Sequence, residues 1–300
     1  MAVILEGGCR VSDMREGRSV VNGTVRIWKQ VGRTTGAHAI SLRVMEFAPR
    51  LSPGIRNDDC DEILYMLKND RVAVEDSSQG QARGPQRGSP AGVEVRSAPP
   101  LDQDLSNRSH PEGVRESAPS IEIFIDGRSF KISADTGIYI RPKQTFAINN
   151  PGPYSIVIVS SQCPDPDREP VFVHAPNNSS MPTGRTTIVR LADQKAQPTA
   201  DRWYRLLVDD EVGSERVTQF VGSIPPGRAP DHFHNYEEVL FILKGEGRMW
   251  AGETNTPIAE GSCIYLPKGQ VHCVENTGEA ELRLLGVFYP AGSPSVRYDV

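Results

Sequence analysis

The sequence predicts an all-β protein, a β-sandwich or β-barrel built twice in tandem. Short segments in which apolar and polar residues alternate recur through most of the chain, and turn-forming residues separate them about every ten positions. No long segment carries the 3.6-residue apolar period of an amphipathic helix. The chain contains 27 glycines and 24 prolines among its 300 residues, a content typical of a protein with many turns.

The individual strands follow from this alternation. In the first half they are expected at 38–47, 62–67, 121–133, 138–150 and 154–161, and Asp126-Gly127 marks a tight hairpin turn within 121–133. In the second half they are expected at 187–191, 203–208, 216–224, 238–243, 262–266 and 282–289. Each segment has the length and the bounding turn residues that are typical of a strand.

The two halves of the chain share four similar segments in the same order. These are a Pro-Gly pair, an apolar segment that starts with glutamate, a Tyr–Pro–Lys segment and an Asn–Gly turn. They lie at 53–54, 62–68, 137–143 and 149–152 in the first half, and at 226–227, 238–244, 262–268 and 275–278 in the second. Because their order is conserved within the chain, we expect two copies of one structural unit.

Changes in composition suggest the domain boundaries. We expect an N-terminal domain at 1–165, a linker at 166–184 that is rich in proline and asparagine, and a C-terminal domain at 185–300. Within the first domain, residues 76–119 are rich in Gly, Pro, Ser, Gln and Arg. Such a segment buries too little apolar surface to offset its ordering entropy, so we predict a flexible insertion there.

Charge and hydropathy exclude several classes of partner. The net charge of −5 argues against nucleic-acid and membrane-surface binding, which need a basic face. No apolar run is long enough to cross a bilayer, and the first residues lack a basic leader. The five cysteines form no CxxC pair, which favours reduced thiols and a cytoplasmic location.

One group of side chains in the second half has the spacing of a metal site. His232 and His234 lie two residues apart, so on a strand both rings point to one face, and Glu238 starts the next strand. A turn with Pro267 precedes His272. An isolated His-x-His pair is more often a packing pair, but the full set favours a mononuclear metal. Imidazole and carboxylate ligands suit Fe(II), Mn(II), Ni(II), Cu(II) or Zn(II).

The segments around these residues resemble the two cupin motifs. GRAPDHFHNYEEVLFILKG is similar to the first motif, with four rather than five residues between Gly227 and His232. GSCIYLPKGQVHCVEN resembles the second motif throughout. The resemblance implies a cupin barrel, a double-stranded β-helix or jelly roll, whose metal ligands are His232, His234, Glu238 and His272. It also implies one divalent transition metal per chain, with Fe(II) or Mn(II) favoured.

The first half resembles a degenerate cupin barrel, so the chain is expected to be a bicupin with one metal. When the repeats are aligned, Arg56 stands opposite His232 and Asp58 opposite His234. Ala147 or Phe146, depending on the alignment, stands opposite His272. A guanidinium in place of an imidazole repels a cation, which is why we expect the metal in the C-terminal barrel alone.

Three functions remain open for such a chain. The favoured one is a dioxygenase or other oxygenase that uses a 3-His-1-Glu metal centre on a small organic substrate, because cupins with this ligand set are often dioxygenases. The second is a non-redox isomerase, lyase or aminohydrolase, and the third is a non-catalytic, ligand-binding bicupin. Catalytic residues other than the ligands are not assigned.

Further candidates line the expected pocket. Gln219, Arg205 and Tyr265 are candidates for contacts with substrate. Leu240, Ile242, Leu285 and Val287 are expected to point into the barrel, where an apolar wall suits a small organic molecule. Cupin barrels commonly pack in pairs, and two barrels in one chain can form that pair internally. We therefore expect a monomer or a homodimer.

Overall fold

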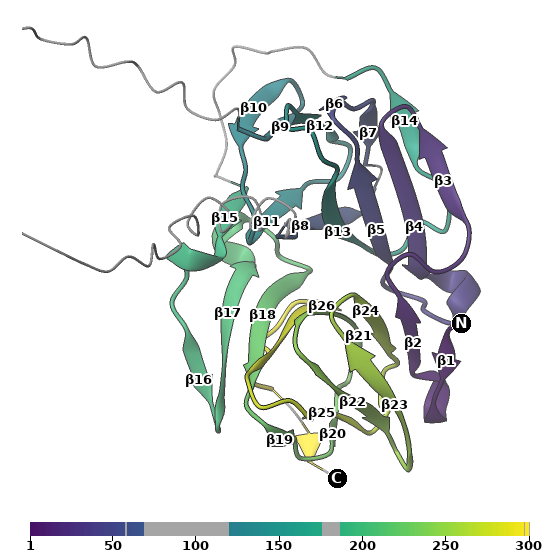
Figure 1. The fold of residues 1–300 in the computed structure, drawn as a ribbon, viewed down its shortest axis with the longest axis vertical. Coiled ribbons are helices and arrows are strands. Elements are labelled where there is room, and N and C mark those ends of the chain that lie inside the picture. Colours follow the sequence, from purple (N-terminus) through teal and green to yellow (C-terminus); the bar gives the residue numbers. More distant parts are fainter. Residues whose placement is uncertain (58, 69–119, 176–186, 297, 300) are drawn as a thin grey trace, which may run out of the picture. The chain divides into compact units, whose positions relative to one another are not determined.

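The computed structural model describes residues 1–57, 59–68, 120–175, 187–296 and 298–299. The predicted insertion at 76–119, part of the predicted linker and Asp58 lie outside these residues. The described chain is all β, as predicted, and its helical segments are four three-residue 3-10 turns at Glu6–Gly8, Arg33–Thr35, Leu191–Asp193 and Asp210–Val212 (Figure 1). No helix among the described residues is long and apolar enough to span a membrane.

The C-terminal barrel consists of two antiparallel sheets. The larger sheet contains, in spatial order, β1 (Val3–Ile4), β2 (Arg10–Asp13), β24 (Ser262–Leu266), β21 (Glu237–Lys244), β26 (Leu282–Tyr289), β18 (Thr218–Ile224), β17 (Arg202–Val208) and β16 (Gln197–Thr199). The smaller sheet contains β23 (Thr254–Ala259), β22 (Glu246–Ala251), β25 (His272–Asn276), β20 (His232–Phe233) and β27 (Tyr298–Asp299), and β19 (Gly227–Arg228) pairs with β25.

The N-terminal barrel repeats this design. Its larger sheet contains β15 (Ile188–Arg190), β11 (Thr136–Ile140), β8 (Asp61–Met66), β13 (Ile156–Cys163), β5 (Leu42–Phe47), β4 (Val25–Val31) and β3 (Ser19–Asn22). Its smaller sheet contains β10 (Arg128–Lys131), β9 (Glu122–Ile125), β12 (Thr145–Asn150), β7 (Gly54–Arg56) and β14 (Val171–Val173), and β6 (Arg50–Leu51) pairs with β12. Asp126 and Gly127 form the predicted hairpin turn, with φ of 47° and 81°.

The two barrels exchange strands. β2 comes from the start of the chain, yet it pairs with β24 of the C-terminal barrel, with Arg10 opposite Tyr265 (Figure 1). In return β15, which follows the predicted linker, pairs with β11 of the N-terminal barrel, with Arg190 opposite Thr136. The boundaries at 165 and 185 stay a prediction, but the sheet hydrogen bonding extends across both of them.

Three apolar cores hold the fold together. One fills each barrel, and the third lies between the two larger sheets, which therefore bury both of their faces. Leu240 and Ile242 point into the C-terminal barrel, as predicted, but Leu285 and Val287 belong to the core between the barrels. The register explains this correction: Leu240 lies opposite Gly286, so the even-numbered residues of β26 face inward.

Candidate metal centre

The four candidate ligands come from three neighbouring segments of the C-terminal barrel. His232 lies in β20 and pairs with His272, the first residue of β25. His234 follows directly after β20, and Glu238 lies near the start of β21. The turn before His272 packs on this segment because the amide of Gly269 donates a hydrogen bond to the carbonyl oxygen of His234, at 2.8 Å. Gly269 has a φ of 78°, a conformation that favours glycine.

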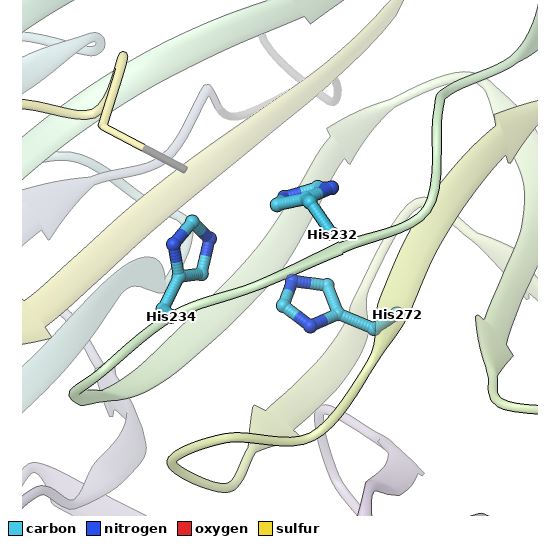
Figure 2. Close-up of side chains that lie close together, drawn as sticks. All are labelled: His232, His234 and His272. Carbon is cyan, nitrogen blue, oxygen red and sulfur yellow. The ribbon is translucent and has the colours of Figure 1, made fainter. Parts of the chain in front are cut away.

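The three imidazole rings face one another (Figure 2). Each offers one nitrogen, and these nitrogens all lie within 4.8 Å of one another. The centroid of the His232 ring is 4.6 Å from that of His272 and 4.9 Å from that of His234. One carboxylate oxygen of Glu238 lies 3.5 Å from Nε2 of His234. The spacing of the motifs predicted this convergence, and its role as a ligand set is taken up below.

Backbone carbonyls fix the proton position on two of the rings. Nδ1 of His232 lies 3.0 Å from the carbonyl oxygen of Pro230, and Nδ1 of His272 lies 2.8 Å from that of Gln270. A carbonyl oxygen only accepts hydrogen bonds, so both Nδ1 atoms carry the proton. In the neutral ring Nε2 then keeps its lone pair, which is the form that a metal-binding histidine needs.

An aromatic stack supports the third ring. The ring of His234 lies parallel to that of Tyr236, with centroids 4.7 Å apart and an interplanar angle of 8°. Tyr236 in turn stacks on Phe288 at 4.5 Å. Because these rings are packed inside the barrel, the stack holds the plane of the His234 ring in place.

Burial sets the charge of the candidate ligands. Desolvation and the neighbouring imidazoles lower the pKa of His234 to about 3 and that of His272 to about 4, so both rings are neutral at pH 7. Desolvation raises the pKa of Glu238 to about 8. Three imidazole nitrogens and a carboxyl group in this arrangement fit a divalent transition metal, because a cation compensates the desolvated carboxylate.

A cavity of about 130 Å³ lies beside the histidines. Part of its wall is apolar, formed by Phe220, Ile224, Leu240, Leu266, Val274 and Leu284. Other lining side chains are polar, namely Thr199, Arg202, Ser223, Tyr236 and Ser295. Thr199 and Arg202 lie on β16 and β17, far from the motifs in sequence and without a recognisable pattern, so the sequence did not indicate them.

The structure corrects the predicted substrate contacts. Gln219, Arg205 and Tyr265 do not line the cavity. Arg205 donates a hydrogen bond to the carbonyl oxygen of Leu191 at 3.0 Å, and the hydroxyl of Tyr265 donates one to the carboxylate of Glu237 at 3.0 Å. These three side chains lie on the face of the larger sheet that points away from the C-terminal cavity, toward the N-terminal barrel.

Strand alternation explains this correction. The neighbouring residues Tyr204, Phe220 and Leu266 line the cavity, and successive side chains of a strand point to opposite faces. In a sheet that is buried on both faces, the polarity of a residue does not show which face it occupies.

In the N-terminal barrel the residue that corresponds to Glu238 is Glu62, and it forms an ion pair with Arg43. Glu62 is fully buried and accepts hydrogen bonds from the Arg43 guanidinium, from Ser160 Oγ at 2.8 Å and from Gln162 Nε2 at 3.3 Å. A guanidinium thus compensates this carboxylate from within the chain. Arg43 lies on β5, and no pattern in the sequence indicated this ion pair.

Comparisons with known proteins agree with this architecture. The cupin domain family model matches residues 220–288. A variant of Bacillus subtilis oxalate decarboxylase has a similar fold, with a TM-score of 0.63 at 12% identity over 93% of this chain and 76% of that one. An uncharacterised protein of Aquifex aeolicus is 33% identical over 87 residues, which are 28% of this chain and 70% of that protein.

Two relatives with descriptive names match segments of similar length. The oxalate-binding protein of Thermotoga maritima is 36% identical over 66 residues, 21% of this chain and 54% of that protein. Auxin-binding protein 1 of Arabidopsis thaliana is 34% identical over 83 residues, 24% of this chain and 42% of that protein. The chain thus spans about half the length of each. It belongs to the cupin superfamily and has the two-barrel architecture.

Proposed function

We propose that the chain is a metal-dependent cupin enzyme that oxygenates a small organic acid. His232, His234, Glu238 and His272 are the ligands of one divalent metal in the C-terminal barrel, with Fe(II) or Mn(II) favoured. The observation that carries the proposal is the convergence of three imidazoles, two of them with Nδ1 held by carbonyls, beside a cavity. The monomeric or dimeric state and the cytoplasmic location stay predictions.

The cavity supports a small anionic substrate. Its volume of about 130 Å³ accommodates a small organic acid. Arg202 is the one permanently charged cation among the lining residues that the structure describes. Its Nε already donates to the carboxylate of Asp201 at 3.0 Å, so a substrate carboxylate would be held by the terminal guanidinium nitrogens, in the cavity that the histidines also line.

The side chains of the wall favour oxygenation over proton-transfer chemistry. Apart from the candidate ligands, the described lining offers Tyr204 and Tyr236 as acids, and burial raises the pKa of Tyr236 far above neutrality. An isomerase or aminohydrolase needs a side chain that exchanges protons near pH 7. A bound redox-active metal supplies the electron-transfer chemistry of an oxygenase, while the chain positions the acid and excludes water with its apolar wall.

A decarboxylase is the second candidate. It is favoured by the likeness in fold to oxalate decarboxylase and by the oxalate-binding relative. Oxalate is also small enough for the cavity. A third possibility is a binding protein without turnover, as the names of the auxin-binding and oxalate-binding relatives suggest.

The metal site is tested first. Protein stripped with a chelator is titrated with Mn(II) and with Fe(II) under nitrogen, and we expect one saturable site per chain. His234→Ala should abolish binding because it removes a ligand, and His174→Ala is the matched control because His174 is exposed and lies in the other barrel. Binding that survives in His234→Ala, or two equal sites in the wild type, would contradict the proposal.

The reaction is tested with small carboxylic acids, including oxalate. Oxygen uptake in proportion to the acid consumed supports the oxygenase. Release of CO2 from oxalate without net consumption of oxygen supports the decarboxylase, and saturable binding with neither supports the binding protein. Arg202→Met should raise KM at least tenfold, and Arg202→Lys should retain part of the affinity.

A further inference from the structure

A second buried carboxylate lies next to Glu238 on β21. Glu237 faces the opposite side of the strand, toward the N-terminal barrel, and is buried. Its carboxylate accepts hydrogen bonds from the backbone amides of His38, at 3.0 Å, and Ala39, at 2.7 Å, and from the hydroxyl of Tyr265, at 3.0 Å. We call these contacts the C-terminal clamp, because they tie the ligand strand to a loop of the other barrel.

The N-terminal barrel has an equivalent arrangement. Asp61 precedes Glu62 as Glu237 precedes Glu238. Its carboxylate accepts a hydrogen bond of 2.6 Å from the hydroxyl of Tyr139, and it forms an ion pair of 2.7 Å with Arg216. We call these contacts the N-terminal clamp. Tyr139 and Tyr265 occupy matching places, since each is one residue before the partner of the buried glutamate in the sheet register.

The two loops that are held also correspond. Each joins two neighbouring strands of the larger sheet, β4 to β5 or β17 to β18. Each contains a 3-10 turn that ends at a glycine with positive φ, at Gly36 with 98° and at Gly213 with 87°. Ala39 and Arg216 each lie three residues after that glycine. The barrels therefore hold each other at two equivalent points.

The surroundings of the two clamps differ. The N-terminal clamp adjoins Glu62, whose carboxylate is already fixed by Arg43. The C-terminal clamp adjoins Glu238, which is paired in the sheet with Leu266 and Phe288 and carries the candidate ligand group. Because adjacent residues of a strand share a rigid peptide plane, a displacement at Glu237 moves the backbone of Glu238.

We propose that Glu237 is a positioning residue for the metal centre, through which the N-terminal barrel sets the affinity of the C-terminal barrel for its metal. This inference rests on the proposed metal site. Residues that orient metal ligands typically contribute 10- to 100-fold to metal affinity. On this proposal the N-terminal barrel influences the metal centre through the loop that holds Glu237. Its own equivalent site is occupied by the ion pair of Arg43 and Glu62.

The test compares the two clamps as a matched pair. Glu237→Gln places an amide NH2 against the backbone N–H donors of the loop. Asp61→Asn likewise replaces a carboxylate by an amide at the N-terminal clamp, where the partners are Tyr139 and Arg216. Calorimetric titration of the metal-free proteins with Mn(II) should show a Kd raised about tenfold in Glu237→Gln and changed less than twofold in Asp61→Asn. Both variants should lower the Tm of the metal-free protein, because both weaken the contact between the barrels.

A milder pair keeps the test decisive if Glu237→Gln does not fold. Tyr265→Phe and Tyr139→Phe each remove one hydroxyl from a clamp, and Mn(II) affinity should fall severalfold in Tyr265→Phe alone. Equal affinities within each pair, despite lowered Tm values, would overturn the positioning role and leave the proposed metal site intact. A wild type with no saturable Mn(II) site would overturn both.

Discussion

Metal binding near pH 7 should release about one proton per chain, and Glu238 should be its source. The pKa of Glu238 is raised to about 8 by burial, so about 0.9 of the carboxyl groups are protonated at pH 7 in the metal-free protein. A metal ligand must be deprotonated, so binding displaces this proton. His234 and His272, with pKa values of about 3 and 4, are already neutral and contribute none.

The proton count is measured by titrating metal-free protein with Mn(II) in buffers of different ionisation enthalpy. The slope of the observed binding enthalpy against that enthalpy gives the number of protons released. At pH 9 the release should fall to about 0.1, because the carboxyl group is then ionised before binding. Glu238→Gln is the control, since it should abolish the release at pH 7. A slope near zero in the wild type, or a release that persists in Glu238→Gln, would refute the reasoning.

Three further predictions concern stability and reactivity. The pKa of Glu238 is raised from 4.5 in the unfolded chain to about 8, so its contribution to stability is present below pH 4.5 and is lost as the pH rises to 8. Denaturant titrations of metal-free protein should therefore show the wild type losing stability relative to Glu238→Gln over this interval; a constant difference would contradict it. A thiol reagent should label native protein at none of its cysteines and unfolded protein at five, because all are buried and burial raises the pKa of Cys273 to about 11. Deleting residues 1–13 should lower the free energy of unfolding by roughly 5 kcal/mol, since Leu5, Cys9 and Val11 pack in the core of the C-terminal barrel; an unchanged Tm would show that β1 and β2 are dispensable.

The sequence predicted those features that depend on local spacing. His232 and His234 are two residues apart, and the turn with Gly269 places His272 at the start of a strand, so their convergence follows from strand and turn geometry. The hairpin at Asp126-Gly127 and the repeated strands were predictable for the same reason. Each local structure is specified within about ten residues, whereas the meeting of His272 with His232, 40 positions apart, was expected from the resemblance to the two cupin motifs.

Features that depend on long-range pairing were not predictable in this way. β2 pairs with β24, and β15 pairs with β11, and in each pair the two strands lie far apart in the sequence. Neither β2 nor β15 differs in composition from an ordinary strand, so the sequence does not show which barrel it joins. The assignment of Gln219 to the cavity failed because both faces of β18 are buried, so a polar residue occurs on either face. Glu237 and its partner loop are about 200 positions apart, which leaves no local trace of the C-terminal clamp.

The two barrels each bury a carboxyl group at an equivalent position, Glu62 or Glu238, and surround it with different partners. A desolvated carboxylate is unstable unless a cation or several donors accompany it. In the N-terminal barrel the Arg43 guanidinium, Ser160 and Gln162 accompany Glu62. In the C-terminal barrel the groups facing Glu238 include imidazoles that stay neutral at pH 7, and the pKa of the carboxyl group rises accordingly. A divalent cation would supply the missing charge there. The proposed metal site therefore differs from its N-terminal counterpart in the source of one positive charge, a divalent cation in one and the Arg43 side chain in the other, and this is the physical reason for expecting a single metal in a chain with two cupin barrels.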